Sequence, residues 1–371
     1  MNEPSDVTRT PPPLAVPPLP PRTTILRLAA IGGVMLALVA GFALSAGWLT
    51  PHRLTQHSFM TAFRVVDGRH PGFRRNHAKG LCVSGWFDGS GQAQVLSTAS
   101  VLGPRRSRVT GRFALAGGMP FQPDAPGKVR SMALRLRPPD GLEWRMGIND
   151  IPVFVARDAR EFHDLLLAGR PDPATGKPDP ARIGPFLAGH AAVARALALV
   201  AARPLTSGFG DDTYNSLDTF RWIDAAGRSV AVRWAMVPLQ PVAPSRAGRD
   251  GSYLFEDLIV ALRQHPLRWR LVVTVAGPGD PTADPTLPWP AGRRQIDAGT
   301  LTLDRAESED DGACTGLTFD PMVLPPGMAA SDDPIPAARS AAYMRSFWLR
   351  SGEARIPSAV SPAMVATGGG Q

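Results

Sequence analysis

The sequence contains few cysteines and few closely spaced histidines, and this excludes several classes of site. Its 371 residues include only two cysteines, Cys82 and Cys314. Two cysteines are too few for a disulfide framework or for a zinc site built from several thiolates. The seven histidines show no pairing at the spacing of metal ligands, which argues against a histidine-built metal site. On this basis we expect both cysteines to be small, packed core residues.

Charge is also scarce, and lysine is nearly absent. Charged residues are 19% of the chain, whereas 44% of the residues are hydrophobic, so wholesale disorder is excluded. The 37 glycines and 39 prolines favour strands and turns over a helical bundle. The net charge is +8, but the basic residues are dispersed arginines rather than a cluster. Nucleic-acid binders concentrate their positive charge, so we expect no nucleic-acid partner.

The N-terminal part of the chain predicts a membrane anchor. Residues 1–27 form a proline-rich tail that is expected to be disordered. Residues 28–49 carry no charged side chain, and as a helix they reach about 33 Å, enough for a hydrocarbon core of about 30 Å. We favour a single-pass transmembrane helix, an uncleaved signal anchor. A cleaved secretory signal is the alternative, because residues 43–45 offer a small-residue cleavage pattern.

The anchor also predicts a location. Long domains cross a membrane largely regardless of flanking charge, so we expect the inner (cell) membrane, with the domain that follows the helix on the periplasmic or outer side. Ala37, Gly41 and Ser45 recur at a spacing that suits a second helix, which leaves a homodimer open as an alternative to plain lipid-facing composition.

Beyond a connector at 50–63, the pattern predicts one domain over 64–355 and a disordered tail over 356–371. Runs of strands with helices inserted among them predict an α+β fold, an antiparallel β-barrel with surrounding helices. Predicted strands are 80–87 and 92–98 as a hairpin, 108–115, 129–136, 153–156, 220–224 and 229–234 as a second hairpin, 271–275 and 299–303. Predicted helices are 159–168, 185–202, 253–264 and 335–349.

His77 is the first candidate for chemistry. It precedes the strand at 80–87, and strand alternation places it on the face of Leu81 and Val83, which is expected to point into the barrel interior. A lone histidine on an apolar face is more often a core residue than a catalytic one. The histidine alone therefore leaves both interpretations open.

The last predicted helix supplies a second candidate. Asp333 before Pro334 is a helix start, and Arg339, Tyr343 and Arg350 then share one helix face. A guanidinium group one helical turn before a tyrosine favours the ionised phenolate form. The pKa of an unperturbed tyrosine phenol is about 10. A buried phenolate needs a strong cation such as ferric iron. An amphipathic helix with a buried tyrosine and two solvated arginines is the alternative.

Five motifs together resemble the haem catalases. They are Arg74-x-Asn-His77-Ala-Lys-Gly, Arg112-Phe, the segment Asn149-Asp-Ile-Pro-Val-Phe-Val-Ala-Arg-Asp, Pro325-Pro-Gly, and Arg339-x-x-x-Tyr343. Their order and spacing match from about residue 64 to 350. The short length, with nothing like a later helical region after the tyrosine helix, resembles the catalase-related peroxidases, so the resemblance implies a catalase-like β-barrel.

The resemblance implies a cofactor and a role for each site residue. The cofactor is haem, expected as haem b, with Tyr343 as the axial iron ligand and Arg339 holding it as tyrosinate. His77 and Asn149 take the catalytic positions on the opposite side of the ring. The positions that hold the haem carboxylates or pack on the macrocycle are Arg74, Arg112, Arg350 and Phe162.

The implied activity is that of a haem peroxidase. Such an enzyme reduces hydrogen peroxide or small organic hydroperoxides through a ferryl intermediate and takes electrons from a donor that is not identified. Weak catalase activity is compatible with the same resemblance. The alternative is a haem-binding or haem-sensing barrel without turnover. Ala114 stands where catalases commonly have a serine that hydrogen-bonds the catalytic histidine. Loss of that hydroxyl is expected to leave the imidazole tautomer less fixed and to favour peroxidase over catalase turnover.

Overall fold

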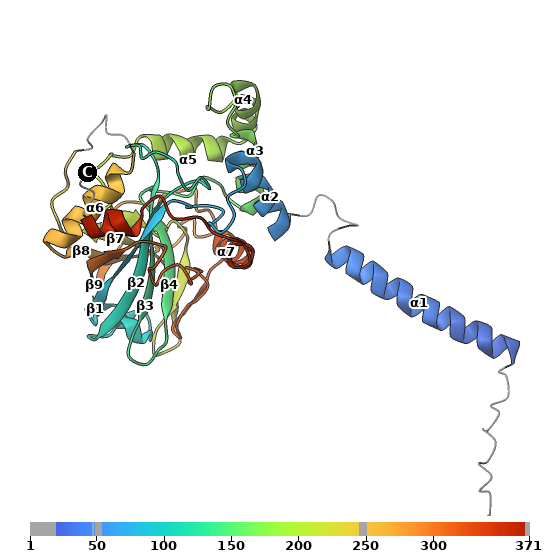
Figure 1. The fold of residues 1–371 in the computed structure, drawn as a ribbon. Coiled ribbons are helices and arrows are strands. Elements are labelled where there is room, and N and C mark those ends of the chain that lie inside the picture. Colours follow the sequence, from blue (N-terminus) through green and yellow to red (C-terminus); the bar gives the residue numbers. More distant parts are fainter. Residues whose placement is uncertain (1–19, 47, 49–53, 245–250, 368–371) are drawn as a thin grey trace, which may run out of the picture. The chain divides into compact units, whose positions relative to one another are not determined.

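The computed structural model describes residues 20–46, 48, 54–244 and 251–367, and the chain divides into two compact units, Met1–Thr55 and Gln56–Gln371 (Figure 1). The first unit contains helix α1 (Pro21–Ser45), with proline in its first turn. Its length and composition suffice to cross a membrane, a property that N-terminal signal sequences share. The helix begins seven residues before the predicted start, so residues 21–27 are not a disordered tail; the rest of the predicted tail, 1–19, lies outside the described residues.

In the second unit, eight of the described strands close into an antiparallel barrel, in the order β1-β2-β3-β4-β5-β7-β8-β9 and back to β1. Strands β6 and β10 extend the sheet beyond β7. The bounds are β1 (Gly80–Gly89), β2 (Arg106–Leu115), β3 (Arg130–Arg137), β4 (Trp144–Asn149), β5 (Tyr214–Asn215), β6 (Phe220–Ile223), β7 (Ser229–Pro238), β8 (Leu267–Val275), β9 (Gln295–Glu307) and β10 (Met328–Ala330).

Alternation along these strands separates an apolar interior from an outer wall. The inward side chains are large, as in Phe113, whose ring centroid lies 5.3 Å from that of Phe209 and 5.9 Å from that of Trp269. Leu81, Phe113, Met132 and Ile148 all belong to this buried core. The alternate residues therefore face outward, where the helices pack. The predicted α+β class, a barrel with helices outside, is confirmed.

Three helices from distant parts of the chain pack together beside the barrel wall: α2 (Gln56–Asp67), α3 (Ala159–Ala168) and α7 (Ile335–Ser351). In Figure 1, α7 lies beside β4, with α2 and α3 near it. A second pair, α6 (Tyr253–Gln264) and α8 (Pro362–Thr367), packs on β9. The remaining helices are α4 (Pro180–Gly189), α5 (Ala191–Ala201) and the short 3-10 helices η1 (Gln92–Val95) and η2 (Ser100–Leu102).

Two strand predictions are wrong. The predicted hairpin partner at 92–98 is replaced by η1, and β1 pairs instead with β2 across the longer connection. The predicted strand at 153–156 has no strand conformation, whereas β4 precedes it at Trp144–Asn149. Gly147 lies inside β4, and glycine weakens a strand signal because it has no side chain to pack.

The helix predictions need two corrections. The connector predicted at 50–63 contains the start of α2, whose Phe59, Met60 and Phe63 are buried on one face. The helix predicted at 185–202 is two helices, which bend by 112° at His190. Helices 159–168 and 253–264 match α3 and α6.

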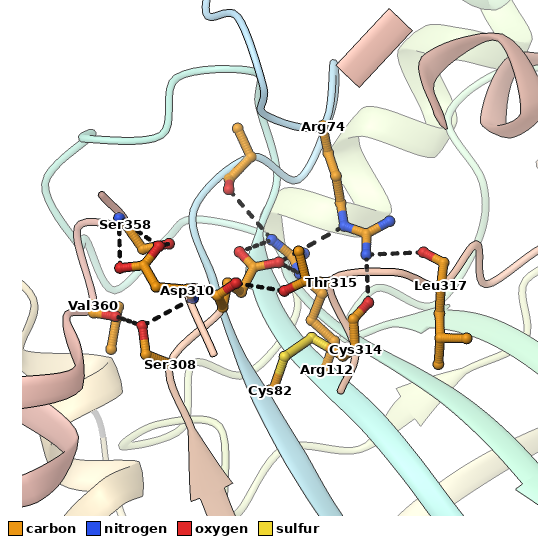
Figure 2. Close-up of a disulfide and its surroundings, with 12 residues drawn as sticks. Arg74, Cys82, Arg112, Ser308, Asp310, Cys314, Thr315, Leu317, Ser358 and Val360 are labelled. Atoms are coloured by element: carbon orange, nitrogen blue, oxygen red, sulfur yellow. Dashed lines mark hydrogen bonds and ion pairs between the residues drawn. A yellow bond between two sulfur atoms is a disulfide. The ribbon is translucent and has the colours of Figure 1, made fainter. Parts of the chain in front are cut away.

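The disordered tail predicted over 356–371 is wrong for its described part. Val360 is fully buried in the barrel core cluster, and α8 follows it. The backbone N–H of Ser358 donates to Asp310, and Ser308 donates to the carbonyl of Val360 (Figure 2). Small residues hid this segment because they give no periodic pattern; the predicted disorder at 368–371 lies outside the described residues.

Val360→Ala tests whether this C-terminal segment belongs to the fold. Removing its two buried methyl groups should lower the free energy of unfolding by about 2 kcal/mol through lost burial and a small cavity. Urea unfolding followed by circular dichroism measures the change. Ala363→Ser, at an exposed position of α8, is the control and should cost less than about 0.5 kcal/mol. Equal stability of the Val360 variant and the parent would contradict the packing described above.

Candidate active site

One cavity brings together all eight residues that the sequence analysis selected. Its volume is about 1180 Å³, including the part open to solvent. It lies between the outer wall of strands β2 to β4 and the helices α2, α3 and α7, and therefore outside the barrel. The selected residues that line it are Arg74, His77, Arg112, Asn149, Phe162, Arg339, Tyr343 and Arg350.

The barrel wall forms a flat floor for this cavity. Strand register places Ala114, Ser131 and Asn149 side by side on β2, β3 and β4. Two residues farther along these strands, the next row of outward-facing residues contains Ala133 and Gly147. A Cβ atom added to Gly147 would lie 2.9 Å from Nη2 of Arg339, so any larger side chain here would require this guanidinium group to shift. Small side chains on a flat wall leave a slot that suits a planar ligand.

His77 reaches the cavity from a turn, and the strand-alternation argument for its direction is wrong. The strand begins at Gly80, and His77 has a φ of 54°, in the left-handed region. The side-chain oxygen of Asn76 stabilises this turn by accepting from the N–H groups of His77 and Gly117, each at 2.9 Å. The imidazole thus lines the outer cavity rather than the barrel interior.

Ser131 links the two candidate catalytic side chains. Its Oγ lies 2.8 Å from Nδ1 of His77 and donates to Oδ1 of Asn149 at 2.5 Å. A hydroxyl has one hydrogen, so Nδ1 of His77 must carry the hydrogen that Ser131 accepts. This arrangement leaves Nε2 of His77 as a proton acceptor and the Asn149 amide N–H groups as donors.

The prediction that Ala114 leaves the imidazole unfixed is therefore wrong. Ser131 is the direct cross-strand neighbour of Ala114 and supplies a hydroxyl to the histidine from the adjacent strand. Only the strand register brings residue 131 beside residue 77. The sequence motif around Ala114 could not show that Ser131 supplies the hydroxyl instead.

The cavity keeps His77 neutral. Burial, followed by the positive charges of Arg112, Arg339 and Arg74, lowers the pKa of His77 to about 3. At neutral pH the imidazole is therefore a proton acceptor rather than a cation.

Helix α7 presents Tyr343 and an arginine that holds it. Arg339 donates to the Tyr343 oxygen at 3.1 Å, to the Gly147 carbonyl at 2.6 Å and to the carboxylate of Asp218 at 2.6 Å. Burial lowers the pKa of Arg339, but the interactions with Tyr343 and Asp218 outweigh it, so the pKa is raised. Asp333 starts the helix as predicted, by accepting from the N–H of Ile335 at 3.0 Å. The alternative of two solvated arginines is wrong for Arg339, which is partly buried and ion-paired.

The other end of the cavity gathers three guanidinium groups around one carboxylate, Glu309, a residue that the sequence analysis missed. Arg112 binds Glu309 through two hydrogen bonds of 2.8 and 2.9 Å, and Nε of Arg74 lies 3.8 Å from it. These cations hold the pKa of Glu309 at about 2 against the effect of burial. Arg350 is partly buried, and burial lowers its pKa to about 10.

This end of the cavity fits a ligand with two carboxylates. Three guanidinium groups face one carboxylate, and the buried Nε of Arg74 has no hydrogen-bond partner. Repulsion from Arg112 and Arg350, after burial itself, lowers the pKa of Arg74 well below its usual range. A dianion would neutralise the excess charge and satisfy the free donor.

The two cysteines are packed core residues, as predicted, but they are also bonded to each other in a disulfide that the sequence analysis did not predict. Cys82 on β1 and Cys314 in the segment after β9 are both buried, with a Cα–Cα distance of 5.4 Å (Figure 2). A chain separation of 232 residues hid the pairing. An even number of cysteines in a chain expected outside the cytoplasm was the available signal.

The comparisons place this geometry in a known family. The Catalase family model matches residues 43–359. The chain is 30% identical over 321 residues to the catalase-related peroxidase of Synechococcus elongatus, covering 85% of this chain and 95% of that protein. It is 32% identical over 304 residues to the catalase-related peroxidase of Mycolicibacterium paratuberculosis, covering 81% of this chain and 96% of that one.

Solved structures show the same fold. A bacterial catalase aligns with a TM-score of 0.67 at 22% identity, and catalase A from Saccharomyces cerevisiae with 0.69 at 20% identity. Each alignment covers 76% of this chain, but the chain spans only 58% and 62% of the length of those two structures.

Glu309→Gln tests the charge balance of Arg74, Arg112 and Arg350, which together form the arginine cluster at this end of the cavity. The variant leaves buried guanidinium groups unpaired, and should lower the free energy of unfolding at pH 7 by about 3 kcal/mol. Urea unfolding measures the loss, with Asp88→Asn in the exposed pair with Arg106 as the control, expected to cost below about 1 kcal/mol.

The difference in stability between the parent protein and Glu309→Gln should also depend on pH. The pKa of Glu309 is about 2 in the folded protein against 4.5 for the free group. Its contribution to stability is therefore complete above pH 4.5 and is lost as the pH falls toward 2. The stability gap between parent and Glu309→Gln should narrow over that interval. A gap that stays constant would contradict the assigned ion pair.

Proposed function

This chain belongs to the catalase family, and we propose that it is a haem-dependent peroxidase that reduces hydrogen peroxide or small organic hydroperoxides. The observation that carries the proposal is the single cavity in which a neutral imidazole, an amide, an arginine-held phenol and an arginine cluster all meet. Two relatives with extensive matches are named catalase-related peroxidases. The preference for peroxidase over catalase turnover rests on those relatives, because Ser131 removes the argument from Ala114.

The residues of the cavity fit haem b. Tyr343 would bind the iron, and Arg339 donates a hydrogen bond to its oxygen. The flat wall and Phe162 would bound the macrocycle, and the arginine cluster would bind its two carboxylates. Bound haem supplies the electrons that cleave the peroxide bond and regains them from a donor.

The side chains of this protein move the proton. Nε2 of His77 accepts the proton from one peroxide oxygen and returns it to the other. That second oxygen then departs as water or an alcohol. Asn149 donates an amide N–H to the peroxide and so orients it. Ser131 keeps both partners in the required hydrogen-bonding state. A haem carrier without turnover needs none of these three groups, which is the reason to favour an enzyme.

The disulfide bears on the location of the enzyme. Disulfides form and persist outside the reducing cytoplasm. Together with an N-terminal helix apolar enough to span a membrane, this supports an inner-membrane protein whose unit Gln56–Gln371 lies on the periplasmic side. The electron donor would then be a reductant of that compartment. A homodimer stays a proposal, for which the four-residue spacing of small residues in α1 is the support.

Tyr343→Phe and His77→Ala should separate cofactor binding from catalysis. Tyr343→Phe removes the ligand oxygen and should abolish haem retention, measured by the Soret band of the purified full-length protein. His77→Ala should retain haem and lower peroxide-dependent dye oxidation by about 10² to 10⁴. If both variants keep full activity, the assigned roles are wrong. A haem-loaded parent protein without turnover would instead favour the carrier.

Ser131→Ala should lower kcat/KM for peroxide by roughly tenfold to a hundredfold with haem retained, because the His77 tautomer and the Asn149 amide are no longer fixed. Steady-state dye oxidation measures it. The rescue variant Ala114→Ser in the Ser131→Ala background places a hydroxyl on the neighbouring strand and should recover much of the loss. Full activity of Ser131→Ala would show that the hydroxyl does not position the catalytic pair.

A further inference from the structure

The disulfide lies in the same row of the barrel wall as Arg112, one member of the arginine cluster. Cys82 on β1 is the cross-strand neighbour of Arg112 on β2, so their side chains share the outer face. Cys314, bonded to it, belongs to the segment that follows β9. Figure 2 shows the sulfur bridge next to Arg112, with Arg74 approaching the same segment from the other side.

That segment supplies the acceptors for the other two arginines. Arg74 donates to the carbonyls of Cys314 and Leu317 at 3.0 and 3.1 Å. Arg350 donates to the carbonyls of Thr315 and Leu317 at 2.7 and 3.0 Å. Two guanidinium groups from distant parts of the chain are thus oriented by four hydrogen bonds to three backbone carbonyls of one loop.

Besides the disulfide, two polar contacts hold the loop to the wall. Glu309 pairs with Arg112 on β2, and Thr318 accepts from Arg145 on β4. The backbone N–H groups of Gly312, Thr315 and Leu317 donate to carbonyls within residues 308–314. An added Cβ at Gly312 would lie 2.6 Å from the sulfur of Cys82, so the loop packs closely on the bridge. The disulfide is the covalent connection between this self-bonded loop and the sheet.

We propose that the Cys82–Cys314 disulfide is a positioning element of the cofactor site: it fixes the carbonyl groups of residues 314–317 and thereby preorganises Arg74 and Arg350 for a dicarboxylate porphyrin. Three cations at close range repel one another, so they stay in a binding arrangement only where fixed acceptors hold them. Without the bridge, the loop and both guanidinium groups gain freedom that ligand binding must then remove. The identity of the ligand rests on the proposed function, whereas the coupling between disulfide and arginines does not.

The test measures binding of zinc protoporphyrin IX and of its dimethyl ester to the full-length protein in detergent, by porphyrin fluorescence. The diacid carries the two carboxylates and the ester does not. Cys82→Ala/Cys314→Ala should weaken diacid binding at least fivefold and change ester binding less than twofold. Leu258→Ala, buried on α6 away from the cavity, is the control for lost stability and should leave the diacid-to-ester ratio unchanged.

Arg350→Gln completes the test as a double-mutant cycle. If the disulfide acts through the arginines, the loss in diacid affinity for Cys82→Ala/Cys314→Ala/Arg350→Gln should be clearly smaller than the product of the separate losses. Multiplicative losses, or equal weakening of diacid and ester by the cysteine variant, would overturn the proposal. A parent protein that binds both porphyrins equally would also overturn it, because the arginines would then not recognise the carboxylates. A parent protein that binds neither porphyrin would instead contradict the haem proposal, so the two failures are distinguishable.

Discussion

A buried guanidinium group must have a fixed acceptor for its hydrogen bonds, and this requirement organises the cavity. Arg339 connects helix α7 to Gly147 on the barrel wall and to Asp218. Arg112 connects the wall to Glu309, while Arg350 connects the far end of α7 to the loop after β9. Since charge in a low-dielectric site is costly without partners, these bonds define where wall, loop and helix lie. The cavity is the space they leave between them.

The same constraint distinguishes the two ends of the cavity. At Tyr343, one cation is balanced by Asp218 and by the phenol oxygen, which leaves a donor aimed at that oxygen. At Glu309, cations outnumber the carboxylate, and an unsatisfied donor remains on Arg74. One end is thus suited to hold an electron-rich oxygen ligand and the other to attract a dianion. A porphyrin with two carboxylates combines both demands in one molecule.

The position of the cavity on the outer barrel wall explains how the candidate catalytic residues are held in place. Three adjacent strands place Ala114, Ser131 and Asn149 in one row, and barrel packing on the inner side keeps that row rigid. The row thereby brings the hydroxyl of Ser131, on β3, within 2.8 Å of Nδ1 of His77. In the haem catalases that the motif resembles, a serine at the position of Ala114 commonly contacts the histidine. Here Ser131 makes that contact with His77. His77 meets it because Asn76 stabilises an unusual backbone conformation.

The sequence alone determined two kinds of feature. Short-range periodicity and turn chemistry indicated the antiparallel barrel class and helices such as 159–168 and 253–264. The residues that line the cavity were identified by the order and spacing of motifs that resemble those of the haem catalases. Only the tertiary structure decided that the cavity lies outside the barrel, that Ser131 replaces the missing hydroxyl, that Glu309 joins the arginines and that Cys82 pairs with Cys314. Each of these depends on strand register or on contacts between residues far apart along the chain, and no local pattern carries that information. The ordered segment around Val360 belongs with them, because its burial depends on a surface that other elements create.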